Sequence, residues 1–151
     1  MVNRYAQRQK GFSLVEVLIA LIIMSIGMLG IAGLYVQSMQ AGRTSMFRHH
    51  AVTLAGDVAD RIRANPRAGI AYMGGGANNN CGAAGAYCDI GQMADNDIFL
   101  WGQQANDTLP NGTVTIQYNA ATVPPEYTIT VAWDEPGDAP TYQITIPVMG
   151  I

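Results

Sequence analysis

Basic residues are missing from the second half of this chain. All eight Lys and Arg residues lie at or before Arg67, whereas eight of the eleven acidic residues follow it. From Ala68 onward, eight acids against no bases give a formal charge of −8. Nucleic-acid affinity depends largely on Lys and Arg side chains that neutralise phosphates. We therefore expect no direct nucleic-acid binding by this half of the chain.

Histidine is equally scarce, since His49 and His50 are the only two. Adjacent helical positions point about 100° apart, so this pair lacks the i,i+4 spacing of a metal-ligand pair, and we expect both at the surface. A catalytic nucleophile needs an adjacent base that a third group orients, and no histidine follows His50 to serve as one. We therefore expect no catalytic residue, no metal or other cofactor, and no enzymatic activity.

The N-terminal part has few charges and contains a long apolar run. From Phe12 to about Val36, Glu16 is the only charged residue, and a membrane-spanning helix needs roughly 20 apolar residues. The preceding segment 1–11 contains three basic residues and no acid, so the positive-inside rule keeps this end cytoplasmic and exports the rest. A secretory signal has a shorter apolar core, of about 7–15 residues, although Gly30-Ile31-Ala32 offers a weak cleavage site.

Glu16 is costly inside such a run. An ionisable side chain at the centre of a membrane span costs on the order of 2.5–3.5 kcal/mol. This cost usually implies a partner of opposite charge. In the alternative reading, the chain is an ordinary single-pass anchor, and Glu16 reaches the headgroups from its position near the cytoplasmic end of the span.

The helix is expected to continue beyond the membrane. Apolar residues recur at helical spacing, and most charged residues lie off their stripe. The stripe consists of Phe47, Ala51, Leu54, Val58 and Ile62. Because the residue before a proline is pushed out of the α region, Asn65-Pro66 predicts the end of the helix. We therefore predict a single helix from Phe12 to about Ala64.

Both cysteines lie in a Gly-, Asn- and Ala-rich stretch on the exported side. Cys81 and Cys88 are close in sequence, and an oxidising compartment favours disulfides. We predict a disulfide that closes this small loop, stabilises the fold by at most about 2–3 kcal/mol and mainly orders local structure. Two free thiols are the alternative, whereas a metal site lacks a second Cys or His pair at ligand spacing.

The rest of the chain predicts one short helix and a small sheet. Asp95-Asn96-Asp97 is a candidate N-terminal cap for an amphipathic helix that ends before Pro110. Apolar and polar residues then alternate in three stretches, at 113–118, 127–133 and 142–148, as in antiparallel strands. The predicted fold class is α+β, with the long helix packed on a small antiparallel sheet of about three strands. Its predicted parts are a basic leader at 1–11, a membrane part of the helix at 12–36, an amphipathic part at 37–65 and a globular head at 66–151.

The N-terminal residues resemble the type IV prepilins, whose basic leader ends in Gly directly before Phe, with Glu at the fifth mature position. Gly11, Phe12 and Glu16 match this pattern. The resemblance implies that the prepilin peptidase cleaves between Gly11 and Phe12 and N-methylates the new terminus. It also implies that Glu16 pairs with the Phe12 amine of a neighbouring subunit, which converts an isolated charge in lipid into an ion pair.

Over nearly its whole length the chain is similar to minor pilins of the PilV type. Segments 25–30, 60–65 and 109–112, the last with Trp101 ahead of it, carry this resemblance. It implies assembly with other minor pilins and the major pilin, through an inner-membrane assembly platform, into a complex that primes the type IV pilus and lies at its tip. The chain would be a single-pass inner-membrane protein before assembly and extracellular afterwards.

Two other functions share part of this pattern. Minor pseudopilins of type II secretion have the same leader, the same Glu and a similar head, so they are the main alternative. A tip adhesin would use Trp101, Trp133 and the tyrosines to bind carbohydrate. The spacing of these aromatic residues, by two or by three to four, favours a place in the core instead.

Overall fold

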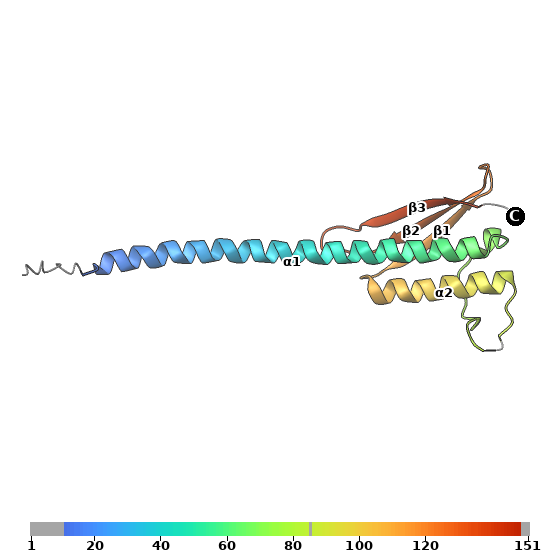
Figure 1. Ribbon diagram of the computed structural model, residues 1–151, viewed down its shortest axis with the longest axis horizontal. Helices are drawn as coiled ribbons and strands as arrows, with labels where there is room; N and C mark the ends of the chain where they lie inside the picture. Colours follow the sequence, from blue (N-terminus) through green and yellow to red (C-terminus); the bar gives the residue numbers. More distant parts are fainter. Residues whose placement is uncertain (1–10, 85, 149–151) are drawn as a thin grey trace, which may run out of the picture. The chain divides into compact units, whose positions relative to one another are not determined.

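The computed structural model describes residues 11–84 and 86–148 (Figure 1). Most of the predicted leader at 1–11 therefore lies outside the described residues. The chain divides into two compact units, at Gly42 and Arg43, and each is described by itself. The elements are α1 (Leu14–Ala64), the short 3-10 helix η1 (Gly69–Met73), α2 (Ile90–Thr108), β1 (Thr113–Asn119), β2 (Glu126–Ala132) and β3 (Thr141–Pro147).

Helix α1 begins two residues later than predicted and ends where predicted. The Ser13 carbonyl accepts a hydrogen bond from the Val17 N–H at 3.3 Å, and serine is a favoured residue at a helix N-cap. This places Phe12 before the helix rather than inside it. At the other end the Asn65 N–H still bonds to the helix, at 3.1 Å from the Arg61 carbonyl, and Pro66 then prevents continuation.

The three predicted strands form one antiparallel sheet in the order β1-β2-β3. Cross-strand neighbours are in register, so that Ile116 lies opposite Ile129 and Ile129 lies opposite Ile144. Side chains alternate between the two faces of a sheet, and on β2 the alternation buries Tyr127, Ile129 and Val131. The sheet therefore presents one apolar face to the helices, which confirms the α+β fold class.

The core of the second unit joins that face to one side of α1. The predicted stripe is confirmed, since Ala51, Leu54, Val58 and Ile62 are buried and Phe47 packs against them. Tyr72 of η1 and Trp101 of α2 complete the core, with their rings stacked at 5.8 Å. At roughly 25 cal/mol per Å² of buried apolar surface, we expect this helix-on-sheet contact to be the main stabilising contribution in the unit.

Helix α2 corrects one prediction. It begins at Ile90 with Asp89 as its N-cap, not at the Asp95-Asn96-Asp97 segment. The Asp89 carboxylate accepts a hydrogen bond from the Gln92 N–H at 2.8 Å, and the Gln92 side chain accepts one from the Asp89 N–H at 3.1 Å. This reciprocal capping box satisfies two backbone donors. Asp95, Asn96 and Asp97 lie inside this helix. Their side chains are typical of an N-cap, but none of them caps the helix.

Candidate functional site

The N-terminal end of α1 places the three motif residues next to one another. Gly11 and Phe12 precede the helix, and Glu16 lies in its first turn. There the positive end of the helix dipole favours a carboxylate. Phe12 and Glu16 border a shallow hollow of about 370 Å³ along one helix face. Within residues 11–84 and 86–148, Glu16 makes no ion pair.

The apolar part of α1 exposes its whole surface. Every residue from Gly11 to Arg43 is exposed, and α1 contains an 18-residue window with a mean hydropathy of 2.6 of which no part is buried. A helix that is apolar on all sides is stable only inside a membrane or among other apolar helices. This surface therefore requires lipid or partner helices around it.

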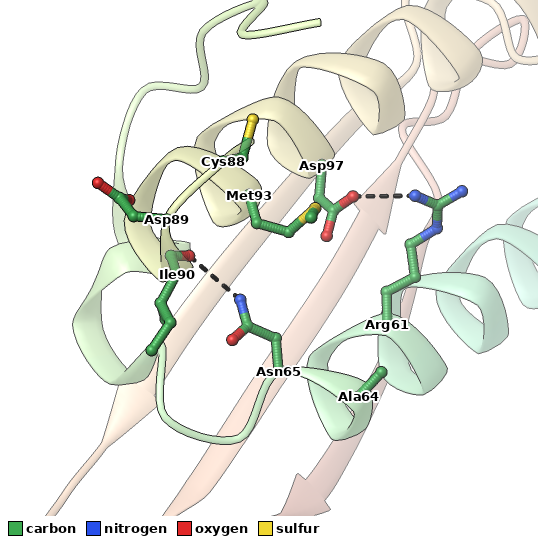
Figure 2. A pocket seen from close by; sticks show the side chains of 8 residues that line it. All are labelled: Arg61, Ala64, Asn65, Cys88, Asp89, Ile90, Met93 and Asp97. Atoms are coloured by element: carbon green, nitrogen blue, oxygen red, sulfur yellow. Dashed lines mark hydrogen bonds and ion pairs between the residues drawn. The ribbon is translucent and has the colours of Figure 1, made fainter. Parts of the chain in front are cut away.

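At the other end of α1, a polar network joins α1 to α2 (Figure 2). The Arg61 guanidinium donates to the Asp97 carboxylate at 2.9 Å, and the Tyr72 hydroxyl donates to its second oxygen at 3.3 Å. Asn65 donates to the Ile90 carbonyl at 3.2 Å. These residues, except Tyr72, border a cavity of about 370 Å³. Because each bond joins segments distant in sequence, the network fixes α2 against the end of α1.

Burial gives this network its strength. Asp97 is only 4% exposed and Tyr72 only 1%. Desolvation raises the pKa of Tyr72 to about 12, with the nearby Asp97 carboxylate adding to the effect and the hydrogen bond from Asn65 opposing it. The phenol thus stays neutral and remains a donor. A buried carboxylate that lost either donor would be strongly destabilising.

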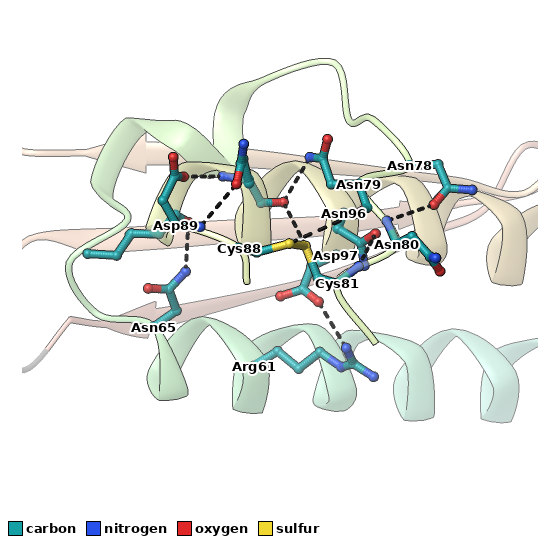
Figure 3. Close-up of a disulfide and its surroundings, with 12 residues drawn as sticks. Arg61, Asn65, Asn78, Asn79, Asn80, Cys81, Cys88, Asp89, Asn96 and Asp97 are labelled. Atoms are coloured by element: carbon teal, nitrogen blue, oxygen red, sulfur yellow. Dashed lines mark hydrogen bonds and ion pairs between the residues drawn. A yellow bond between two sulfur atoms is a disulfide. The ribbon is translucent and has the colours of Figure 1, made fainter. Parts of the chain in front are cut away.

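The predicted disulfide is present, and its loop lies against α2 (Figure 3). The sulfur atoms of Cys81 and Cys88 are bonded, and their Cα atoms are 5.7 Å apart. The Cys81 N–H donates to the Asn96 side chain at 3.4 Å, and Asn79 donates to the Gln92 carbonyl at 3.0 Å. The segment before the disulfide is therefore held by hydrogen bonds as well as by the covalent link.

Gly76 permits a close approach of this segment to α2. Its φ is +70°, and a Cβ at this position would lie 2.8 Å from Ile98 and 2.9 Å from the Phe99 nitrogen. Only glycine tolerates both the left-handed backbone and this contact. The position of Gly76 in a run of three glycines hides this requirement in the sequence.

Both tryptophans belong to the core. Trp101 is 1% exposed and donates its indole N–H to Asp57 at 3.2 Å, while Trp133 is 3% exposed and donates to Glu135 at 2.9 Å. Because both side chains are buried, neither can line an open carbohydrate site. This argues against the tip adhesin, for which they were the main candidate binding residues.

Glu135 also attaches the β2–β3 turn to α1, because Thr44 donates to its second oxygen at 2.7 Å. These bonds, first from Trp133 and then from Thr44, lower the pKa of the Glu135 carboxyl. Thr44 lies at the start of the second unit.

Sequence reasoning missed the polar network. It assigned Asp57 and Arg61 to a charged face off the apolar stripe and Asp97 to a cap. The i,i+4 spacing of Asp57 and Arg61, whose side chains are 3.6 Å apart, was the one available signal. Asp97 gave none, because its burial follows from the packing of α2. Within the described residues, no group of three His, Cys, Asp or Glu side chains could hold a metal ion.

Comparison with known proteins gives two family matches. Residues 6–32 match the prokaryotic N-terminal methylation motif, and residues 33–99 match the family described as Type IV pilin Tt1218. The first match contains Gly11, Phe12 and Glu16; the second runs from the end of the apolar run through the disulfide and into α2. No curated protein and no solved structure matches the chain.

Proposed function

We propose that this chain, which belongs to the type IV pilins, is a minor pilin of the PilV type that primes assembly of the type IV pilus from its tip. Type IV pilins are structural proteins rather than enzymes, and this one is anchored in the inner membrane before assembly. It is a substrate of the prepilin peptidase and assembles with other pilins. The minor role, the tip position and the identity of its neighbours form the proposal.

One observation carries the processing and assembly part of the proposal: Gly11, Phe12 and Glu16 occur together at the start of a helix that is apolar and exposed in its first part and continues into a folded head. Cleavage after Gly11 would create a positive amine at Phe12, four residues from Glu16. In a stack of such helices, the amine of one subunit can approach the carboxylate of another. Pairing offsets the cost of Glu16 in lipid and favours assembly over a lone subunit.

The properties of the head favour a function based on protein–protein contact. A head-to-tail interface that does not close on itself generates a helical filament. The charge of −8 from Ala68 onward disfavours a role in binding DNA directly. The inner-membrane assembly platform, the major pilin and other minor pilins are the proposed partners.

Mass spectrometry of the mature chain tests the processing step. We expect an N-methylated phenylalanine at Phe12. A mature chain that begins at Met1, or beyond Ala32, would contradict cleavage after Gly11.

Deletion of the gene separates the pilus from type II secretion. The proposal expects loss of surface pili and of twitching motility, with protein secretion intact and both pilus phenotypes restored by the gene in trans. The reverse result would assign the chain to the minor pseudopilins of type II secretion, which remain the alternative.

A further inference from the structure

Strand β3 (Thr141–Pro147) is an edge strand with an open side. Within residues 11–84 and 86–148 it pairs only with β2, and Figure 1 shows it as the outer strand. The other edge of the sheet differs, since η1 and α2 both lie against β1. Edge strands with unpaired main-chain groups are templates for pairing with another chain.

The register between β2 and β3 determines which main-chain N–H and C=O groups of β3 do not bond to β2. The Trp133 N–H bonds to the Pro140 carbonyl at 3.2 Å and the Val148 N–H to the Pro125 carbonyl at 2.7 Å. Hydrogen-bonded pairs alternate along an antiparallel ladder, so the even-numbered residues of β3 bond to β2. The N–H and C=O groups of Thr141, Gln143 and Thr145 therefore point outward. No residue among 11–84 and 86–148 bonds to them, and all three residues are exposed.

This edge has little of the usual protection. Natural edge strands are blocked by lysines, inward-pointing charges, bulges, prolines or very short length. Strand β3 is seven residues long and uncharged, and only Pro147 at its end limits pairing. Its register with β2 is continuous from Thr141 to Pro147, so it has no bulge.

An apolar hollow adjoins the same edge. Its volume is about 320 Å³, and it lies between the end of α1 and the end of β3. Its lining is mostly apolar but includes one charged side chain, Arg63, beside Ile62, Pro66, Ile146, Pro147 and Val148. A strand added beside β3 would place alternate side chains on the inner face of the sheet. One apolar side chain of that strand could enter the hollow, next to Ile146.

A second copy of this chain does not fit as the occupant. Strand β3 runs in the same direction as α1 within the second unit, because Glu135 before β3 bonds to Thr44, and Ile146 near its end lines the same hollow as Ile62. Two-fold pairing of two β3 edges would orient these α1 segments in opposite directions. Membrane-anchored copies, however, all enter the same membrane from the same side. In a second copy, η1 and α2 lie against β1, which leaves less room for an added strand there.

We infer that the outer edge of β3 binds an extended, uncharged segment of a different protein of the fibre, which adds a fourth strand to the sheet. Main-chain hydrogen bonds to Thr141, Gln143 and Thr145 provide the affinity, and an apolar side chain in the hollow provides the selectivity, as in other strand-addition complexes. The partner is a neighbour in the fibre, so the inference rests on the proposed assembly function but not on whether the fibre is a pilus.

Photo-crosslinking tests this edge in the full chain. A benzophenone amino acid is placed at Gln143 in cells that carry the fibre system of this protein. The control places it at Thr115, which lies at the same level on the opposite strand, since Thr115 pairs with Thr130 and Thr130 with Gln143. We expect an adduct with a different chain from Gln143, at about tenfold or more the yield from Thr115.

Edge-blocking variants show whether main-chain pairing forms the adduct. With the benzophenone at Thr145, Gln143→Pro removes one outward N–H and should lower the yield about tenfold, which corresponds to about 1.4 kcal/mol. Gln143→Ala keeps that N–H and should preserve the yield. If Gln143→Pro fails to fold, Gln143→Lys blocks the edge by charge and should also lower it. No adduct from Gln143, equal yields from Thr115, or adducts only between two copies of this chain would overturn the inference.

Discussion

Glu16 joins two properties that are rarely found together, a carboxylate and an entirely apolar surrounding surface. Its position in the first turn of α1 gives it a favourable helix dipole, but not a counter-charge. In the described residues it has no ion-pair partner. In the proposed assembly, the processed Phe12 of another subunit would supply this counter-charge.

We predict that Glu16→Gln prevents incorporation into fibres while the chain still inserts in the membrane. Gln cannot form the ion pair, so the fibre-bound fraction should fall at least about tenfold, the change that about 1.4 kcal/mol produces. Immunoblots of sheared fibres and of membranes measure the two pools. Ser25→Ala is the control, because the Ser25 hydroxyl already bonds to the Leu21 carbonyl within α1 at 2.7 Å. Normal incorporation of Glu16→Gln would refute the pairing.

Glu135 predicts a dependence of head stability on pH. Its carboxyl pKa is lowered in the fold, first by Trp133 and then by Thr44. A group with a lowered folded pKa stabilises the fold above its unfolded pKa, near 4.3 for Glu, and this contribution is lost as the pH falls through the folded pKa. We expect Glu135→Gln to lower the melting temperature at pH 7, with a difference from the native chain that shrinks below about pH 4.3.

Thermal unfolding of the detergent-solubilised chain between neutral and acidic pH measures this difference. Glu126→Gln is the matched control, since no described residue donates a hydrogen bond to the Glu126 side chain. A constant difference between the native chain and Glu135→Gln at every pH would contradict the role of the ionised carboxylate.

At the scale of elements, the periodicity of apolar residues predicted the helix stripe and the strands, whereas the residue types at the helix ends did not predict the caps. The stripe of α1 and the alternation of the three strands are set by burial on one face, which the sequence displays directly. The ends of the helices depend on single hydrogen bonds. Asp89 and Gln92 form a capping box just after Cys88, where the predicted disulfide loop obscured it. The contacts of Arg61 with Asp97 and of Thr44 with Glu135 arise only when distant segments pack, so no local pattern could reveal them.

The true cap of α2 can be identified by mutation. Asp89→Ala removes the capping oxygen and should cost about 0.5–2 kcal/mol, a drop of roughly 4–8 °C in melting temperature for each kcal/mol. Asp95→Ala is the control from the segment first assigned as the cap. No described residue donates a hydrogen bond to the Asp95 side chain, so its melting temperature should change little. A larger loss for Asp95→Ala than for Asp89→Ala, measured by circular dichroism, would contradict Asp89 as the cap.

At the scale of the whole molecule, the chain combines two surfaces that need different surroundings. The unit up to Gly42 exposes apolar side chains, whereas the unit from Arg43 encloses its own core of helix, sheet and disulfide loop. Every buried residue of α1 lies at or after Ala51. The second unit therefore contains all the buried contacts of α1, although the helix itself is continuous through Gly42.

We predict that a chain beginning at Arg43 folds without detergent. It keeps the whole core, so its melting temperature should lie within roughly 4 °C of that of the full chain, a shift that about 1 kcal/mol causes. A chain beginning at Val58 is the control. It loses Ala51, Leu54 and Ala55, which are at most 1% exposed, and removing even one buried Leu side chain costs about 2–5 kcal/mol. The control should therefore be unfolded, with no near-ultraviolet circular dichroism from Trp101 and Trp133. If the Arg43 chain is equally unfolded, the apolar half of α1 stabilises the head as well as anchoring it, and the division of roles between the two units is wrong.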